Sequence, residues 1–80
     1  MTREKVFNGV QGIFRDIFDE DDLMISDTTS SDEIEDWDSL NHINLVSAIE
    51  KEFKIKFTLI EINTLNNVGS IIDLVLEKLK

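Results

Sequence analysis

The 80-residue chain contains no cysteine and only one histidine, and these shortages exclude several kinds of site. Without cysteine there are no disulfides, thiolate metal sites, iron–sulfur clusters or thiol nucleophiles. A single histidine excludes a metal site built from several histidines. Proline is absent, and the three glycines, Gly9, Gly12 and Gly69, are too scattered to form a phosphate-binding loop.

Basic residues are also scarce, with eight Lys and Arg against seventeen Asp and Glu, a formal net charge of -9. Nucleic-acid binding and docking on an anionic membrane both require a basic surface, so we expect neither. A partner with a basic surface is the better expectation. Eleven of the acids lie between Asp16 and Asp38, where there is no base.

Apolar residues recur at helical spacing over two long segments. The first is Arg3 to Phe18, with Thr2 as N-cap. The second begins near Ser39, with Asp38 or Ser39 as N-cap. Its predicted apolar stripe consists of Leu40, Ile43, Leu45, Val46, Ile49 and Phe53. Its predicted polar, solvent-facing side includes Asn41, His42, Asn44 and Ser47.

Two more helices are predicted near the C-terminus. Thr58 and Glu61 fit a capping box that opens a short helix, Leu59 to Leu65. Asn66 or Asn67 then caps a last helix. The alternating segment Phe53 to Leu59 has no strand to pair with, so we predict an extended connection.

The segment from Asp19 to Asp38 has no periodicity and is predicted to be a long acidic loop. Its apolar residues are expected to anchor it to the core: Leu23, Met24, Ile25, Ile34 and Trp37. The sequence thus predicts an all-α, four-helix bundle with three longer helices and one short helix, forming a single domain over residues 1–80. The chain shows no secretion signal or membrane span, so we expect a cytoplasmic location. We also expect the protein to be a monomer.

Two kinds of chemistry fit poorly. The acidic loop does not match an EF-hand, because starting at Asp27 places Asp32 where glycine is required, and no metal site is expected. Asp38, Ser39 and His42 offer the residue types of a hydrolase triad. A small helical bundle, however, gives little room for a substrate pocket and an oxyanion hole. We therefore expect no enzymatic activity.

The sequence Trp37-Asp38-Ser39-Leu40, the apolar stripe after it and Val68-Gly69-Ser70-Ile71 together resemble an acyl carrier protein. The resemblance covers about Val6 to Leu79. It implies that a phosphopantetheinyl transferase attaches 4'-phosphopantetheine from coenzyme A to Ser39. The thiol of that arm would hold acyl groups as thioesters and carry them between biosynthetic enzymes. The lack of cysteine is compatible with this, because the cofactor supplies the sulfur.

The resemblance also suggests roles for other residues. Asp38, Leu40 and His42 are candidates for partner recognition, with core packing equally open for Leu40 and a solvent-facing position favoured for His42. A linear acyl chain would insert between the helices. Its candidate lining residues are Leu45, Val46, Ile49, Ile60, Ile62, Leu65, Val68 and Ile71.

The second helix departs from the family pattern, since fatty-acid carriers usually have acids there that dock on basic enzyme surfaces. Here Lys51 separates the helix acids Glu50 and Glu52, and most of the negative charge precedes Ser39 instead. A specialised carrier for a polyketide, peptide, modified lipid or polysaccharide pathway is therefore at least as good an expectation as fatty acid biosynthesis. Two alternatives remain open. One is a peptidyl or aminoacyl carrier of the same fold, and the other is an acidic interaction module in which Ser39 is only a helix cap.

Overall fold

The computed structural model describes residues 2–79, which form four helices. They are α1 (Arg3–Ile17), α2 (Ser39–Phe53), α3 (Leu59–Thr64) and α4 (Val68–Lys78). No strand occurs in this range; Ser30 and Asn67 form an isolated bridge. The all-α prediction, with three longer helices and one short one, is confirmed.

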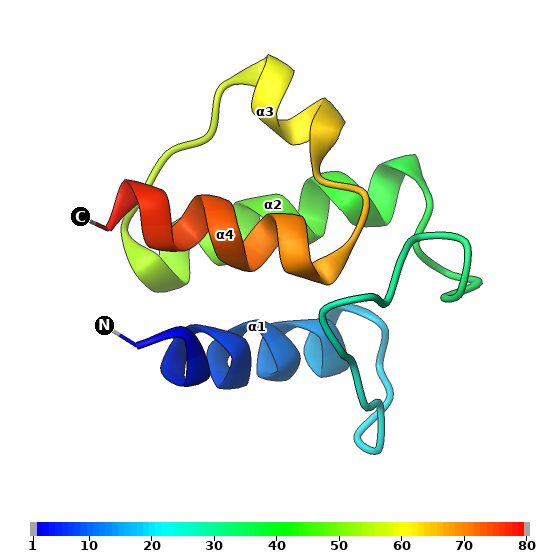
Figure 1. Ribbon diagram of the computed structural model, residues 1–80. Helices are drawn as coiled ribbons and strands as arrows, with labels where there is room; N and C mark the ends of the chain where they lie inside the picture. Colours follow the sequence, from blue (N-terminus) through cyan, green and yellow to red (C-terminus); the bar gives the residue numbers. More distant parts are fainter. Residues whose placement is uncertain (1, 80) are drawn as a thin grey trace.

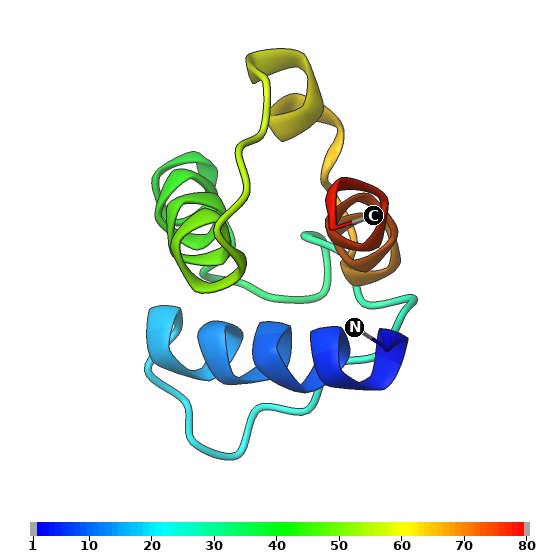
Figure 2. The same cartoon turned by 90° about the vertical axis from the view of Figure 1, so that its left-hand side faces the viewer.

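Figures 1 and 2 show how the helices are arranged. In Figure 2, α2 and α4 lie on either side with α1 below them, and α3 lies above. The buried side chains fill the space between α1, α2 and α4, together with residues of the connections. They are Val6, Val10, Ile13, Phe14, Phe18, Ile25, Trp37, Leu45, Val46, Ile49, Phe53, Phe57, Leu65, Val68, Ile71, Ile72 and Val75. No side chain of α3 is fully buried, so α3 is the helix least embedded in the core.

The predicted helix starts are confirmed, and the open choices are settled. The Thr2 side chain accepts a hydrogen bond from the Lys5 backbone N–H. Thr58 forms a complete capping box with Glu61. Asn67, rather than Asn66, caps α4 by accepting from the Ser70 amide.

Polar contacts that the apolar pattern did not predict hold the long acidic loop against α1 and α4. On the α1 side, Arg15 Nε donates to the Leu23 carbonyl, and Gln11 Oε1 accepts from the Ile25 amide. On the α4 side, the amide of Gly69 donates to the Asp27 carbonyl over 2.9 Å. A Cβ at residue 69 would lie 2.8 Å from that carbonyl oxygen, so only glycine allows this close approach.

Four of the five predicted loop anchors pack on the core, and one prediction is wrong. Ile25 and Trp37 are buried, and Leu23 and Ile34 are partly buried against the core. Met24 is 75% exposed. Its side chain lies on the surface instead, where the sulfur accepts from Arg15 Nη2 at 3.4 Å.

Candidate functional site

The start of α2 is built by Asp38 rather than by Ser39. Asp38 is the N-cap: its Oδ1 accepts from the Asn41 amide at 2.9 Å, and its carbonyl accepts from the His42 amide at 2.8 Å. Ser39 is the first helical residue and is exposed. The interpretation of Ser39 as merely a helix cap is therefore wrong, because the preceding aspartate performs that function.

The Ser39 hydroxyl has no hydrogen-bond partner among residues 2–79. Over the same range, the backbone N–H groups of Ser39 and Leu40 are also unpaired, as expected for the first amides of a helix. A helix N-terminus with free N–H groups favours an anion such as a phosphodiester. Ser39 thus presents a free hydroxyl beside two free donors.

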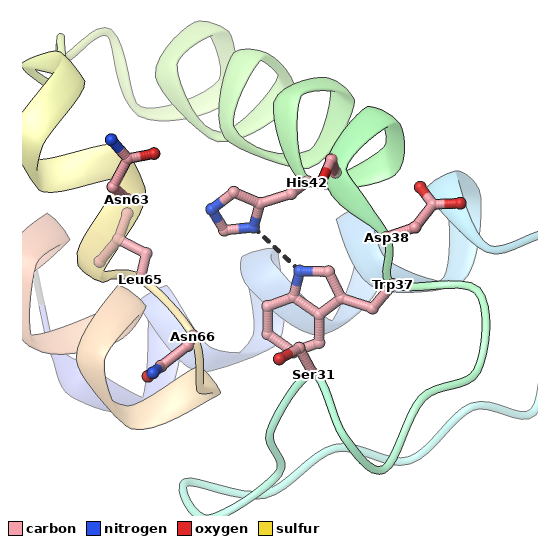
Figure 3. A pocket seen from close by; sticks show the side chains of 8 residues that line it. Ser31, Trp37, Asp38, His42, Asn63, Leu65 and Asn66 are labelled. Atoms are coloured by element: carbon pink, nitrogen blue, oxygen red, sulfur yellow. Dashed lines mark hydrogen bonds between the residues drawn. The ribbon is translucent and has the colours of Figure 1, made fainter.

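A pocket of about 300 Å³ lies beside Ser39, between the loop, α2 and the segment around the end of α3 (Figure 3). Its lining residues are Ser31, Trp37, Asp38, Ser39, His42, Asn63, Leu65 and Asn66. Of these, Ser31 and Asn63 carried no signal in the sequence, and Asn66 was considered only as a helix cap. They meet only because the loop and the α3–α4 connection pack against the start of α2.

His42 connects two walls of this pocket. Trp37 Nε1 donates to His42 Nδ1 at 2.9 Å, and His42 Nε2 lies 2.8 Å from the Ile62 carbonyl oxygen of α3 (Figure 3 draws the first contact). The solvent-facing position expected for His42 is wrong, because its ring is partly buried between the loop and α3. Both ring nitrogens are engaged, so neither is available to deprotonate Ser39 as a triad would require.

One sequence signal could have placed His42 correctly. Val46, Ile49 and Phe53 lie four, seven and eleven residues after it, on the buried face of α2. His42 extends this face by one turn. The start of the predicted stripe is correspondingly wrong, since Leu40 is 72% and Ile43 51% exposed.

Trp37, which lines the pocket, contacts several aromatic rings. Its ring is nearly perpendicular to that of Phe14, with a centroid distance of 5.2 Å, and the ring centroid of Phe18 lies 6.5 Å away. Only 6% of Trp37 is exposed. The hydrogen bond to His42 satisfies its buried N–H, which would otherwise be costly to leave unpaired.

The candidate acyl-lining residues divide into three groups. Six of them are buried among the helices: Leu45, Val46, Ile49, Leu65, Val68 and Ile71. Ile62 is partly buried against this core. Ile60 is 78% exposed, so its placement in the interior is corrected: it lies on the outer side of α3.

Residues 8–75 match the model of a family described as "Phosphopantetheine attachment site". The chain belongs to this family of acyl carrier proteins. A similar solved structure is the holo acyl carrier protein from Geobacter metallireducens, with 43% identity and a TM-score of 0.85, covering 92% of this chain and 85% of that one. No curated protein was matched.

Membership of this family identifies the cofactor of the acyl carrier protein as a covalently attached 4'-phosphopantetheine. Carrier domains of this type are not catalysts. Their role is to hold a covalently bound group. Among residues 2–79, no helix is long and apolar enough to cross a membrane, and no group of three or more His, Asp or Glu gathers to bind a metal ion.

Proposed function

We propose that Ser39 is the attachment residue and that this carrier shuttles acyl groups, bound as thioesters, between biosynthetic enzymes. The single observation that carries the proposal is the accessibility of the Ser39 hydroxyl. Its hydroxyl is exposed and unpaired at the first position of α2, with capping left to Asp38. The hydroxyl is thus free to react without the loss of a contact that holds the fold.

The local structure fits an attached phosphodiester. In the transferase complex, Ser39 Oγ would attack the β-phosphorus of coenzyme A. A new P–O bond forms, the bond to the leaving 3',5'-ADP breaks, and a base of the transferase takes the hydroxyl proton. The free amides of Ser39 and Leu40 then lie beside the anion. The arm supplies the terminal thiol that bears the cargo.

The exposed surface around Ser39 supports docking of partner enzymes. Leu40 is 72% exposed one residue after Ser39, and Ile43 follows one turn later on α2. Core packing was equally open for Leu40, and it is excluded by this exposure. Large exposed apolar side chains near a reactive residue are suited to contact with a partner. We assign Leu40 and the neighbouring Asp38 to recognition of the transferase and acyl-processing enzymes.

The charge pattern favours a specialised pathway. The first turn of α2 contains no acid, whereas the loop before it holds most of the negative charge. A partner enzyme whose basic residues face α2 would be attracted only weakly to this chain. An enzyme whose basic residues face the acidic loop would be attracted more strongly. The similarity to an acyl carrier protein favours acyl cargo over peptidyl or aminoacyl cargo.

An intact-mass measurement tests the attachment. The protein is incubated with coenzyme A and a broad-specificity phosphopantetheinyl transferase. We expect the mass gain of one arm, its loss in Ser39→Ala and its retention in Ser47→Ala. Ser47 is a matched control, because it is an exposed serine of the same helix. No gain in the wild type, under conditions that load a known carrier, would reject the proposal.

A further inference from the structure

We propose that His42 is a positioning residue that, as a neutral imidazole, holds Trp37 and α3 on opposite sides of the pocket beside Ser39. Its two ring nitrogens contact two different segments. One meets the indole N–H of the loop, and the other meets the Ile62 carbonyl of α3. His42 lies one turn after Ser39, so the bridge forms next to the reactive hydroxyl.

The donors and acceptors permit only one form of the ring. Indole is only a donor, so Nδ1 of His42 must accept and carries no proton. A carbonyl is only an acceptor, so Nε2 must carry the proton and donate to Ile62. The bridge therefore requires the neutral Nε2–H tautomer.

Protonation of His42 would break its contact with Trp37 and keep its contact with the Ile62 carbonyl. A proton on Nδ1 would face the Trp37 N–H, leaving that buried donor without an acceptor. The Nε2–H would still donate to Ile62, whose carbonyl lies in the last turn of α3, where a cation is favoured. The centroids of the two rings are 6.1 Å apart, with a hydrogen bond between their edges. The cation would thus lie beside the indole rather than over its face, where attraction is strongest.

The charged groups around His42 are few. Asp38 is the only other titratable residue that lines the pocket, and its Oδ1 accepts from the Asn41 amide. On α3, the Glu61 carboxylate points to the Thr58 amide and to Lys78. On α2, residues 39–49 contain no Asp, Glu, Lys or Arg, so His42 is the one residue of this stretch that can gain a charge near neutral pH. The Trp37 contact thus depends mainly on the protonation of His42.

The hydrogen bond from His42 to Ile62 matters because α3 makes few other contacts with the rest of the protein. It buries no side chain completely, and its described ion pair is Glu61 with Lys78 at 2.9 Å. Elements with few buried contacts open more readily than the core. The His42–Ile62 hydrogen bond is therefore one of a few contacts that fix α3 beside the pocket, together with the packing of Ile62 against the core.

The test is unusually clean because the chain has one histidine and one tryptophan. In NMR spectra of the unmodified protein at about pH 8, we expect the ¹⁵N signals of the neutral Nε2–H tautomer. As acid is added stepwise, the single indole N–H signal should shift together with the His42 signals, because the two side chains share a hydrogen bond. An Nδ1–H tautomer, or an indole signal unmoved by His42 titration, would overturn the proposal.

Variants separate the two halves of the bridge. In His42→Asn, the side-chain oxygen can replace Nδ1 as acceptor, and the indole signal should no longer depend on pH. In His42→Ala, α3 amides should exchange about fivefold faster relative to α4 amides, the fold-change that corresponds to one neutral hydrogen bond. Equal acceleration in α3 and α4 would indicate a general loss of stability and reject positioning.

The consequence for Ser39 rests on the proposed attachment there. With wild-type loading established, His42→Ala should slow loading by the transferase, and His42→Asn should restore part of the rate at about pH 8. Unchanged loading in His42→Ala would show that the bridge does not position the site. Failure of the wild type to load would instead count against the attachment, while leaving the NMR result on His42 intact.

Discussion

Asp38 illustrates how one side chain serves both stability and the site. Its carboxylate caps α2, so the hydroxyl of Ser39 is not needed as a cap. The same carboxylate lies at the rim of the pocket beside Ser39. The capping role needs a short side-chain acceptor, whereas recognition by a basic partner would need the negative charge. Substitution can separate these requirements.

Replacing Asp38 by serine should keep the cap and remove the charge. We expect the free energy of unfolding, measured by urea denaturation, to stay within a few tenths of a kcal/mol for Asp38→Ser, and to fall by about 1 kcal/mol for Asp38→Ala. If the carboxylate is recognised, both variants should load more slowly. Equal loading by Asp38→Ser and the wild type would remove Asp38 from recognition, and equal destabilisation of the two variants would contradict its role as cap.

Among the elements, α1 contains two glycines that the sequence does not distinguish. Glycine in a helix interior costs about 1 kcal/mol relative to alanine. Gly9 packs against the ring of Phe53 at the end of α2, where an added Cβ would lie 2.9 Å from Cζ. Gly12 is exposed, and a Cβ there would meet nothing within 4 Å. Only Gly9 therefore has a packing role between helices.

This contrast predicts different effects of alanine at the two positions. Gly12→Ala should raise the free energy of unfolding by about 1 kcal/mol, because the helix gains propensity at no steric cost. Gly9→Ala should gain less or lose stability, because the Phe53 ring must move. Thermal or urea unfolding of the two variants measures the difference. Equal stabilisation would show that Phe53 yields freely and that α1 does not need a glycine there.

At the scale of the whole molecule, the charge is divided between the loop and the helices. Within residues 2–79, Asp27 is the only acid of the segment from Asp16 to Asp38 that forms an ion pair, with Arg3 at 3.4 Å. The other acids of this segment are available to attract a basic partner. An uneven charge distribution of this kind mainly affects the rate of association.

Raised salt should therefore slow loading and transfer to partner enzymes while the fold stays intact. Between about 0.01 M and 0.15 M salt, the screening length falls from about 30 Å to 8 Å. Transferase kinetics and unfolding curves over this range provide the measurement. Neutralising Glu35 and Asp36, which precede Ser39 by four and three residues, should reduce the salt dependence more than neutralising Asp21 and Asp22. Strong stabilisation by salt with unchanged rates would identify the acids as a source of self-repulsion instead.

The sequence by itself determined the helices, the caps of the first and third helices, and the attachment candidate. These are local properties: the period of the apolar residues predicted the spans, and the spacing of Thr58 and Glu61 predicted the capping box that the structure contains. The family resemblance was carried by Trp37 to Leu40 together with the apolar stripe after it and Val68 to Ile71, and family membership is confirmed. Each of these patterns is read from residues that lie close together in the sequence.

Only the tertiary structure decided which apolar side chains face the interior and how His42 is used. Leu40, Ile43 and Ile60 fit an apolar pattern but remain exposed, because no element among residues 2–79 covers these side chains. His42 was assigned to a polar face, yet it meets Trp37 and, across twenty residues of sequence, the Ile62 carbonyl. Contacts between distant segments depend on how the elements pack, and a backbone carbonyl leaves no side-chain signal in the sequence.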